Sequence, residues 1–215
     1  MIRNIAAFGD SWIHGDEIVH PDPAASNKEK RLYREENCTV GQLGKLLGLT
    51  VENYGVSGNS LQGTVWEFYH WLNDEHRHTD ASPRETLVVV GLTESSRNSW
   101  WNGNNFVHNH IMHDHHPWNS FVKHHYMYNE DETVERIRYW ETTEFFYNWC
   151  NTNAVKLLMV NVFPPPYLSN LVTHPSWNMR GEVSGDMLAP GKHANEKGSI
   201  HLAKHLQMYA KSIII

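Results

Sequence analysis

Apolar residues form four short runs along the chain that predict buried β-strands. The three stronger runs cover residues 2–8, 86–92 and 155–163, and a weaker run covers residues 50–54. Their apolar positions follow one another without the alternation that is typical of a strand facing water on one side. We therefore expect these runs to be strands of a parallel sheet that is buried on both faces.

Between and after these runs, apolar residues recur at the three- and four-residue spacing of amphipathic helices. This spacing predicts four helices, over residues 39–47, 61–73, 132–150 and 195–209. Strands that alternate with helices over short connections are typical of a doubly wound α/β sandwich.

The length fits one domain, because domains of about 150 residues are common and the chain has 215. We expect a single domain over residues 1–215 with loop insertions at about residues 13–37 and 95–130, where the apolar periodicity is lost. Both insertions follow the carboxyl end of a predicted strand, which is where open α/β sheets bind their ligands. The insertions are therefore expected to border the functional site.

The composition excludes several classes of protein. A hydrophobic fraction of 40% with 9 Trp, 9 Tyr and 7 Phe argues against a disordered chain. No apolar run reaches the roughly 18 residues of a membrane span, so we expect no membrane partner. The net charge is −6 with no basic stripe, which argues against nucleic-acid binding. Two cysteines are too few for a disulfide framework, and no signal peptide is recognisable, so a cytoplasmic location is expected.

Three polar blocks fall in loops where a catalytic site could form. The first strand ends in Gly-Asp-Ser-Trp at residues 9–12, and a serine on such a turn presents its hydroxyl and its backbone N–H at the sheet edge. The second block is Asn-Tyr-Gly-Val-Ser-Gly-Asn-Ser at residues 53–60, and the third begins at His193, just before the last predicted helix. Taken singly, each block is more typical of a helix cap or an ordinary loop.

Taken together, the order and spacing of these blocks resemble the SGNH (GDSL-type) hydrolase family, and the resemblance covers most of the chain in outline. The helix over residues 40–49 and the glycine at position 198 are also similar to the family's pattern. The resemblance implies a flavodoxin-like three-layer α/β/α sandwich with a mostly parallel sheet. It also implies ester hydrolysis, with Ser11 as nucleophile, His193 as base, and the N–H groups of Ser11 and Gly58 as oxyanion donors.

Two positions depart from the family's motifs. Thr93 stands where the family has an asparagine whose side chain is a third oxyanion donor, and a threonine hydroxyl has a shorter reach than an amide. Pro190 stands three residues before His193, where the family has an aspartate. Asp186 is the candidate to orient His193 through a loop. A backbone carbonyl in that role, or a Ser–His dyad, are the alternatives.

From these residues we expect a serine esterase or acyl hydrolase, and more specifically a carbohydrate O-deacetylase. The catalytic residues would be Ser11, His193 and Asp186. The residues expected to bind the oxyanion or the substrate are Asp10, Trp12, Gly58, Asn59 and Thr93. The expected partner is a small-molecule or glycan ester, no cofactor is expected, and an oligomer is left open. The alternative function is a weakly active or inactive member of the same fold that serves as a binding or structural protein.

Residues 108–125 hold a cluster of seven histidines. Imidazole is a common ligand of zinc, nickel and copper, so His113 and His115 are candidate metal ligands. The spacings match no defined metal motif, and the Trp and Tyr residues of the same segment fit a lid or a contact surface equally well. The sequence leaves these alternatives open.

Overall fold

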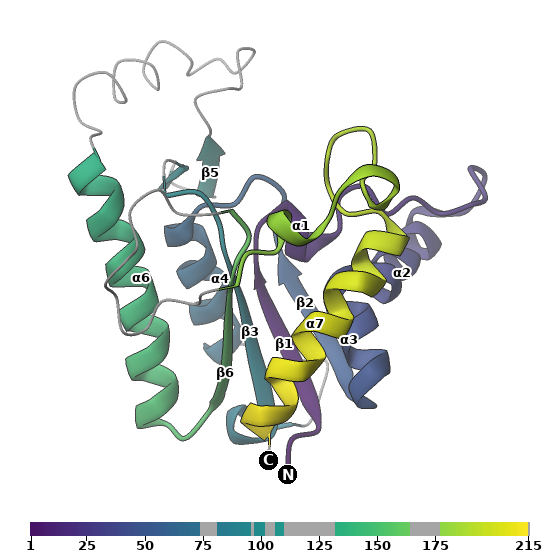
Figure 1. The fold of residues 1–215 in the computed structure, drawn as a ribbon. Helices are drawn as coiled ribbons and strands as arrows, with labels where there is room; N and C mark the ends of the chain where they lie inside the picture. The colour runs from purple at the N-terminus through teal and green to yellow at the C-terminus, as the bar shows by residue number, and fades with distance from the viewer. Residues whose placement is uncertain (74–80, 96, 102–105, 110–131, 164–176, 215) are drawn as a thin grey trace.

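The protein is described from a computed structural model that places residues 1–73, 81–95, 97–101, 106–109, 132–163 and 177–214 (Figure 1). Its main sheet has four parallel strands in the order β2-β1-β3-β6. Their bounds are Asn4–Gly9 for β1, Thr50–Gly55 for β2, Thr86–Leu92 for β3 and Lys156–Asn161 for β6. All four predicted strands are therefore confirmed, with ends that shift by one or two residues.

Helices cover both faces of this sheet, which makes the predicted three-layer α/β/α sandwich (Figure 1). One face is covered by α3 (Thr39–Leu47) and α7 (Glu196–Ile214), and the other by α4 (Leu61–Asn73) and α6 (Glu132–Thr152). Within β1, Ile5 and Ala7 pack toward the first pair of helices, while Ala6 and Phe8 pack toward the second. Both faces of the strand are apolar, which explains why its sequence shows no alternation. Within the described ranges, none of the helices has the length and apolar character needed to cross a bilayer.

The strand register brings the carboxyl ends of the central strands together. Gly9 at the end of β1 is paired with Gly55 of β2, and Phe8 is paired with Val90 of β3. The loops after β1, β2 and β3 consequently leave the sheet at the same end, the carboxyl end of the strands. Parallel α/β sheets usually bind ligands at this end.

The two expected loop insertions contain regular structure. The segment 13–37, expected to be a loop, contains helix α2 over Asn27–Asn37, and the second insertion contains an antiparallel hairpin of β4 (Asn98–Trp101) and β5 (Phe106–Asn109). Helix α2 begins with a capping box, in which Ser26 and Glu29 satisfy each other's backbone N–H groups. The described residues also form short helical turns, namely α1 (Ser11–His14), η1 (Pro83–Glu85), η2 (Arg180–Glu182) and η3 (Gly185–Met187).

Aromatic side chains fill the core between the sheet and the helices α4 and α6. Phe68 of α4 is fully buried at the centre of this cluster. Its ring lies 5.0–6.1 Å, centroid to centroid, from those of Phe8, Trp71, Phe145, Phe146 and Trp149. One side chain thereby links β1, α4 and α6.

Phe68→Ala should therefore destabilise the fold by about 3–5 kcal/mol, because it leaves a cavity among five aromatic neighbours. The neighbouring substitution Tyr69→Ala is a matched control, since 57% of Tyr69 is exposed and its loss should cost less than about 1 kcal/mol. Urea unfolding followed by circular dichroism gives both free energies. Equal losses for the two variants would contradict the packing described for α4.

Candidate active site

Ser11 sits on a turn that only a glycine at position 9 allows. Gly9 ends β1 with φ +153°, and a Cβ atom there would lie 2.6 Å from Ile13 Cγ1 and 2.9 Å from the carbonyl oxygen of Gly91. Asp10 follows as the N-cap of α1, where its Oδ1 accepts the N–H of Trp12 at 3.0 Å. Ser11 is thus the first residue of a helical turn whose leading N–H groups have no partner within the helix.

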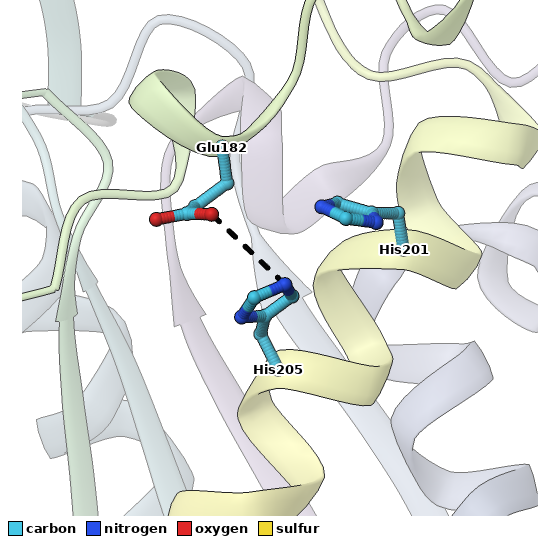
Figure 2. Close-up of side chains that lie close together, drawn as sticks. All are labelled: Glu182, His201 and His205. Carbon is cyan, nitrogen blue, oxygen red and sulfur yellow. Dashed lines mark ion pairs between the residues drawn. The ribbon is translucent and has the colours of Figure 1, made fainter.

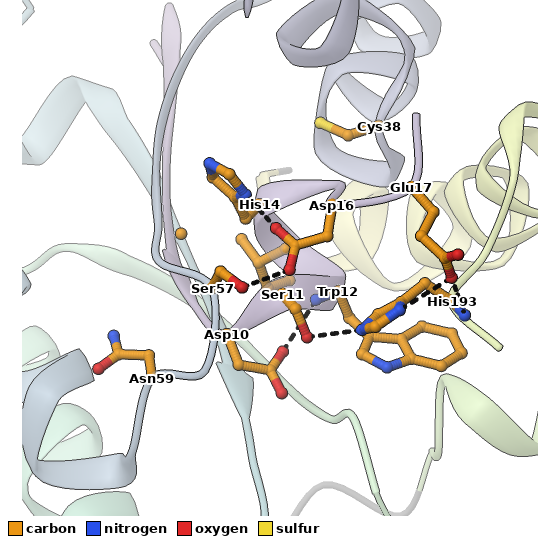
Figure 3. Close-up of polar contacts among 12 residues, drawn as sticks. Asp10, Ser11, Trp12, His14, Asp16, Glu17, Cys38, Ser57, Asn59 and His193 are labelled. Carbon is orange, nitrogen blue, oxygen red and sulfur yellow. Dashed lines mark hydrogen bonds and ion pairs between the residues drawn. The ribbon is translucent and has the colours of Figure 1, made fainter. Parts of the chain in front are cut away.

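The structure brings Ser11 and His193 into hydrogen-bond contact although 182 residues separate them (Figure 3). His193 lies in the loop between η3 and α7, and its Nε2 is 2.8 Å from Ser11 Oγ. The loop is held in place by a hydrogen bond of 2.9 Å from the N–H of Ala189 to the carbonyl oxygen of His193. A serine and a base at this distance have the geometry of a nucleophile and the group that takes its proton.

Glu17, just after α1, holds the other side of the imidazole (Figure 3). Its Oε2 is 3.0 Å from His193 Nδ1 and accepts the backbone N–H of His193 at 2.9 Å, while its Oε1 accepts the N–H of Gly191 at 2.6 Å. A carboxylate only accepts hydrogen bonds, so Nδ1 must carry the proton and Nε2 of the neutral ring must accept the Ser11 hydroxyl. Partial burial raises the pKa of Glu17, but these hydrogen bonds outweigh it and hold the pKa below its usual value.

Asp186, the expected partner of His193, does not occupy this position. Its carboxylate pairs with Lys197, and 74% of its side chain is exposed. The pairing with Lys197 also lowers the pKa of Asp186. Its backbone carbonyl accepts from the side chain of Asn195, and among the described contacts none joins Asp186 to His193 itself. The carboxylate in contact with the imidazole is therefore that of Glu17, a residue that the sequence analysis does not single out.

Asp10 and Thr93 are paired with each other beneath the site. Thr93 Oγ1 donates to Asp10 Oδ2 at 2.8 Å, and Arg97 Nη1 donates to the same oxygen at 3.2 Å. Asp10 is fully buried, and this burial raises its pKa against the opposing effects of Arg97 and Thr93. Since a hydroxyl has one proton to donate, Thr93 in this arrangement is not a third oxyanion donor, contrary to the expectation from sequence.

Trp12 and Asn59 are both buried next to the residues of the site. Trp12 is only 4% exposed, and its ring lies 5.7 Å from the imidazole of His193. Asn59 is fully buried; its Nδ2 donates to the carbonyl oxygen of Gly9 at 3.3 Å and its Oδ1 accepts the N–H of Ser60. Gly58, by contrast, has φ +72° and open space within 4 Å of the position that a Cβ would occupy. Of these three residues, Gly58 is the one whose backbone borders open space, where a ligand can contact it.

A second polar group ties the loop after β2 to α1. Ser57 Oγ donates to Asp16 Oδ2 at 2.5 Å, and His14 Nδ1 pairs with Asp16 Oδ1 (Figure 3). Burial raises the pKa of Asp16, but the hydrogen bonds with His14 and Ser57 together lower it by more. The pKa of Asp16 is therefore below its usual value. These contacts fix the loop that carries Gly58 relative to Ser11.

The chain's two cysteines are unsuited to serve as an alternative nucleophile. Cys38 and Cys150 are both free thiols and both buried. Burial raises the pKa of each, to about 12 for Cys150, so neither forms a thiolate at neutral pH. Among the described residues, the hydroxyl of Ser11, which contacts His193, is the better candidate for a nucleophile.

The candidate metal ligands His113 and His115 lie outside the described residues, so the structure does not test them. Within the described ranges, the histidines and carboxylates that lie close enough to share a metal ion are Glu182, His201 and His205, on η2 and α7. They belong to other segments than Ser11, Glu17 and His193.

No family model matches the sequence, and no curated protein matches it. Solved structures do resemble the fold. One is a carbohydrate esterase whose active site displays divergent catalytic and non-catalytic binding functions: it is 12% identical with a TM-score of 0.54, and the alignment covers 98% of this chain and 65% of that one. An acetyl xylan esterase from the rumen bacterium Butyrivibrio proteoclasticus is 9% identical with a TM-score of 0.54, and the alignment covers 99% of this chain and 64% of that one.

A member of the lipolytic G-D-S-L family from Veillonella parvula is 12% identical with a TM-score of 0.43 over 97% of this chain and 99% of that one. The two esterases with TM-scores above 0.5 carry the comparison, and the chain spans just under two thirds of the length of each. At these identities the likeness concerns the fold. The fold expected from the SGNH-type motifs is thereby confirmed.

Proposed function

We propose that the protein is a serine-dependent ester hydrolase in which Ser11, His193 and Glu17 act as nucleophile, base and orienting carboxylate. The observation that carries the proposal is the continuous series of contacts from Ser11 Oγ to His193 Nε2 at 2.8 Å and from His193 Nδ1 to Glu17 Oε2 at 3.0 Å. This is the arrangement by which hydrolases of several unrelated folds activate a serine.

In the proposed reaction, Ser11 Oγ attacks the ester carbonyl while His193 Nε2 takes the hydroxyl proton. Glu17 stabilises the imidazolium that forms, because its carboxylate already accepts the Nδ1 proton. His193 then gives its proton to the leaving alcohol, which leaves an acyl group on Ser11. A water molecule, deprotonated by the same imidazole, releases the acid and restores the serine.

The negative charge on the carbonyl oxygen needs hydrogen-bond donors in the transition state. We assign this role to the backbone N–H groups of Ser11 and Gly58. Ser11 begins α1, whose leading N–H groups are not used within the helix, and Gly58 adjoins open space. With Thr93 bonded to Asp10, two donors are proposed instead of the family's three.

For the substrate we propose an acyl ester of a carbohydrate, with acetyl as the acyl group. The support is the fold shared with a carbohydrate esterase and an acetyl xylan esterase. A short-chain aryl ester is the first substrate to try, because its good leaving group makes little demand on binding. Acetylated xylan is the second.

A fluorophosphonate probe should label the protein on Ser11, because such probes react with a hydroxyl that a neighbouring base activates. Peptide mass spectrometry locates the adduct, and Ser11→Ala is the control. The matched variant Ser212→Ala removes an exposed hydroxyl that donates to the carbonyl oxygen of Tyr209 on α7, and it should keep its label on Ser11. Labelling that survives Ser11→Ala, or an adduct on another residue, would exclude Ser11 as the nucleophile.

A binding role without turnover is the second candidate function. The observation that favours it is the hydrogen bond from Thr93 to Asp10, which removes one of the donors that the family uses. Loss of one oxyanion donor costs about 10²–10³ in rate. Binding of acetylated xylan by a protein that neither hydrolyses esters nor reacts with the fluorophosphonate would support this candidate over the esterase.

A further inference from the structure

A second cluster of ionisable side chains lies at α7, formed by Glu182, His201 and His205 (Figure 2). The two histidines are four residues apart on α7 and so share one face of that helix. Glu182 approaches them from η2. Each residue offers one ligand atom, and these three atoms lie within 4.8 Å of one another.

The ligand atoms of this cluster are spaced widely enough to take a metal ion between them, and His205 and Glu182 form a long ion pair (Figure 2). His205 Nε2 is 3.9 Å from Glu182 Oε2, which is too long for a hydrogen bond. Ligand atoms at about 2.1 Å from a tetrahedral zinc ion lie about 3.4 Å from one another. The ligand atoms of the cluster therefore need to approach one another by a few tenths of an ångström to about 1.4 Å, which rotation of the side chains can supply. The side chains of His205 and Glu182 are 32% and 36% exposed, which leaves both open to ions in solution.

One ring of the cluster is held in a fixed orientation. The indole of Trp177 stacks on the imidazole of His205, with centroids 5.9 Å apart and planes 18° apart. The ring of His201 lies 4.7 Å from that of His205, centroid to centroid. Packing of this kind reduces the entropy that a ligand loses when it coordinates a metal.

We propose that Glu182, His201 and His205 form a binding site for a divalent transition metal, with zinc as the probe ion. Two imidazoles and a carboxylate are a zinc ligand set that leaves a fourth position to water. Bound metal would join η2, which follows β6, to α7, which follows the loop of His193. The proposal is independent of the hydrolase function.

Zinc should protect both histidines from diethyl pyrocarbonate, because coordination occupies the nitrogen that the reagent modifies. Peptide mass spectrometry on the whole chain reads the peptide of His201 and His205 separately from residues 108–125. In Glu182→Gln both reporters remain but a ligand is lost, so the zinc concentration needed for protection should rise by at least about 10-fold, as even outer partners of zinc ligands cause. Asp186→Asn removes a carboxylate four residues after Glu182. This variant should need the same zinc concentration for protection as the wild-type protein.

Calorimetric titration with zinc provides a second measurement that does not depend on chemical reactivity. The double variant His201→Ala/His205→Ala keeps a helix-compatible residue at both positions and should bind one zinc ion fewer than the wild-type protein. An unchanged zinc stoichiometry in the double variant would overturn the proposal. Zinc protection confined to the peptide of residues 108–125 would overturn it as well.

Discussion

Ser11→Ala and His193→Ala should each lower kcat for a short-chain aryl ester by about 10⁴–10⁶-fold, and the double variant should be no slower than either single variant. The reason is that Ser11 Oγ and His193 Nε2 are 2.8 Å apart and act as one unit in the proposed mechanism. Once the hydroxyl is gone the base has no proton to take, and once the base is gone the hydroxyl is not activated. Initial rates measured with excess ester give the three values of kcat.

Slow hydrolysis by surface imidazoles sets the floor of this measurement, because the chain has 16 histidines and imidazole itself attacks aryl esters. The double variant therefore also serves as the background that is subtracted from each single variant. Multiplicative losses in the double variant, or a Ser11→Ala protein that keeps the wild-type kcat, would contradict a shared mechanism. Urea unfolding of each variant separates loss of catalysis from loss of fold.

The strands at the centre of the sheet are the part of the fold that the sequence predicts best. Every residue of β1 and of β3 is buried, because helices cover both faces and a strand flanks each edge. After the polar residues Asn4 and Thr86 at their first positions, both strands consequently consist of apolar residues and glycine. Strand β2 is only partly buried and contains the polar residues Thr50, Glu52 and Asn53, so its run in the sequence is weaker.

Helix α2, in contrast to the central strands, cannot be predicted from an apolar pattern in the sequence. None of its residues is buried, so it shows no apolar stripe from which a helix could be predicted. Its capping box of Ser26 and Glu29 was nevertheless present in the sequence three residues apart. A search for that local signal would have found the start of the helix.

Some residues of the candidate site are marked by a short sequence motif, whereas another is identified only by contacts with residues far along the chain. Ser11 and His193 were predictable because each stands in a short motif, and the fold brings the two motifs together. Glu17 was not predictable, because its partners at positions 191 and 193 lie more than 170 residues away and no motif marks it. Its approach depends on Gly15, whose left-handed conformation at φ +82° ends α1 and turns the chain toward the loop of His193.

Glu17→Gln should lower kcat by about 10²–10⁴-fold, whereas Asp186→Asn should leave kcat within about threefold of wild type. The glutamine amide can turn an N–H₂ group toward Nδ1, which then favours the tautomer with the proton on Nε2, and that nitrogen can no longer accept the proton of Ser11. The carboxylate of Asp186 pairs with Lys197 in solvent and has no part in this contact. Steady-state kinetics of the two variants test the assignment.

The pH profile separates an electrostatic role of Glu17 from a purely structural one. Hydrogen bonds from His193 and Gly191 hold the pKa of Glu17 below its ordinary value of about 4.3, so the carboxylate is charged throughout the range from pH 5 to 8. The stability that these bonds contribute is present above the ordinary value and is lost only as the pH falls through the lower folded value. Titration of Glu17 therefore does not produce an acidic limb in kcat/KM above about pH 5.

In Glu17→Gln the imidazolium loses the negative charge that stabilises it, so the acidic limb of kcat/KM should move to lower pH while the maximum falls. A variant that only loosened the loop of His193 would lose rate without such a displacement. In Asp186→Asn the limb should coincide with that of the wild-type protein. The assignment would be wrong if the acidic limb moved in Asp186→Asn and stayed in place in Glu17→Gln. The negative charge that supports His193 would then come from Asp186, in the loop of residues 185–187.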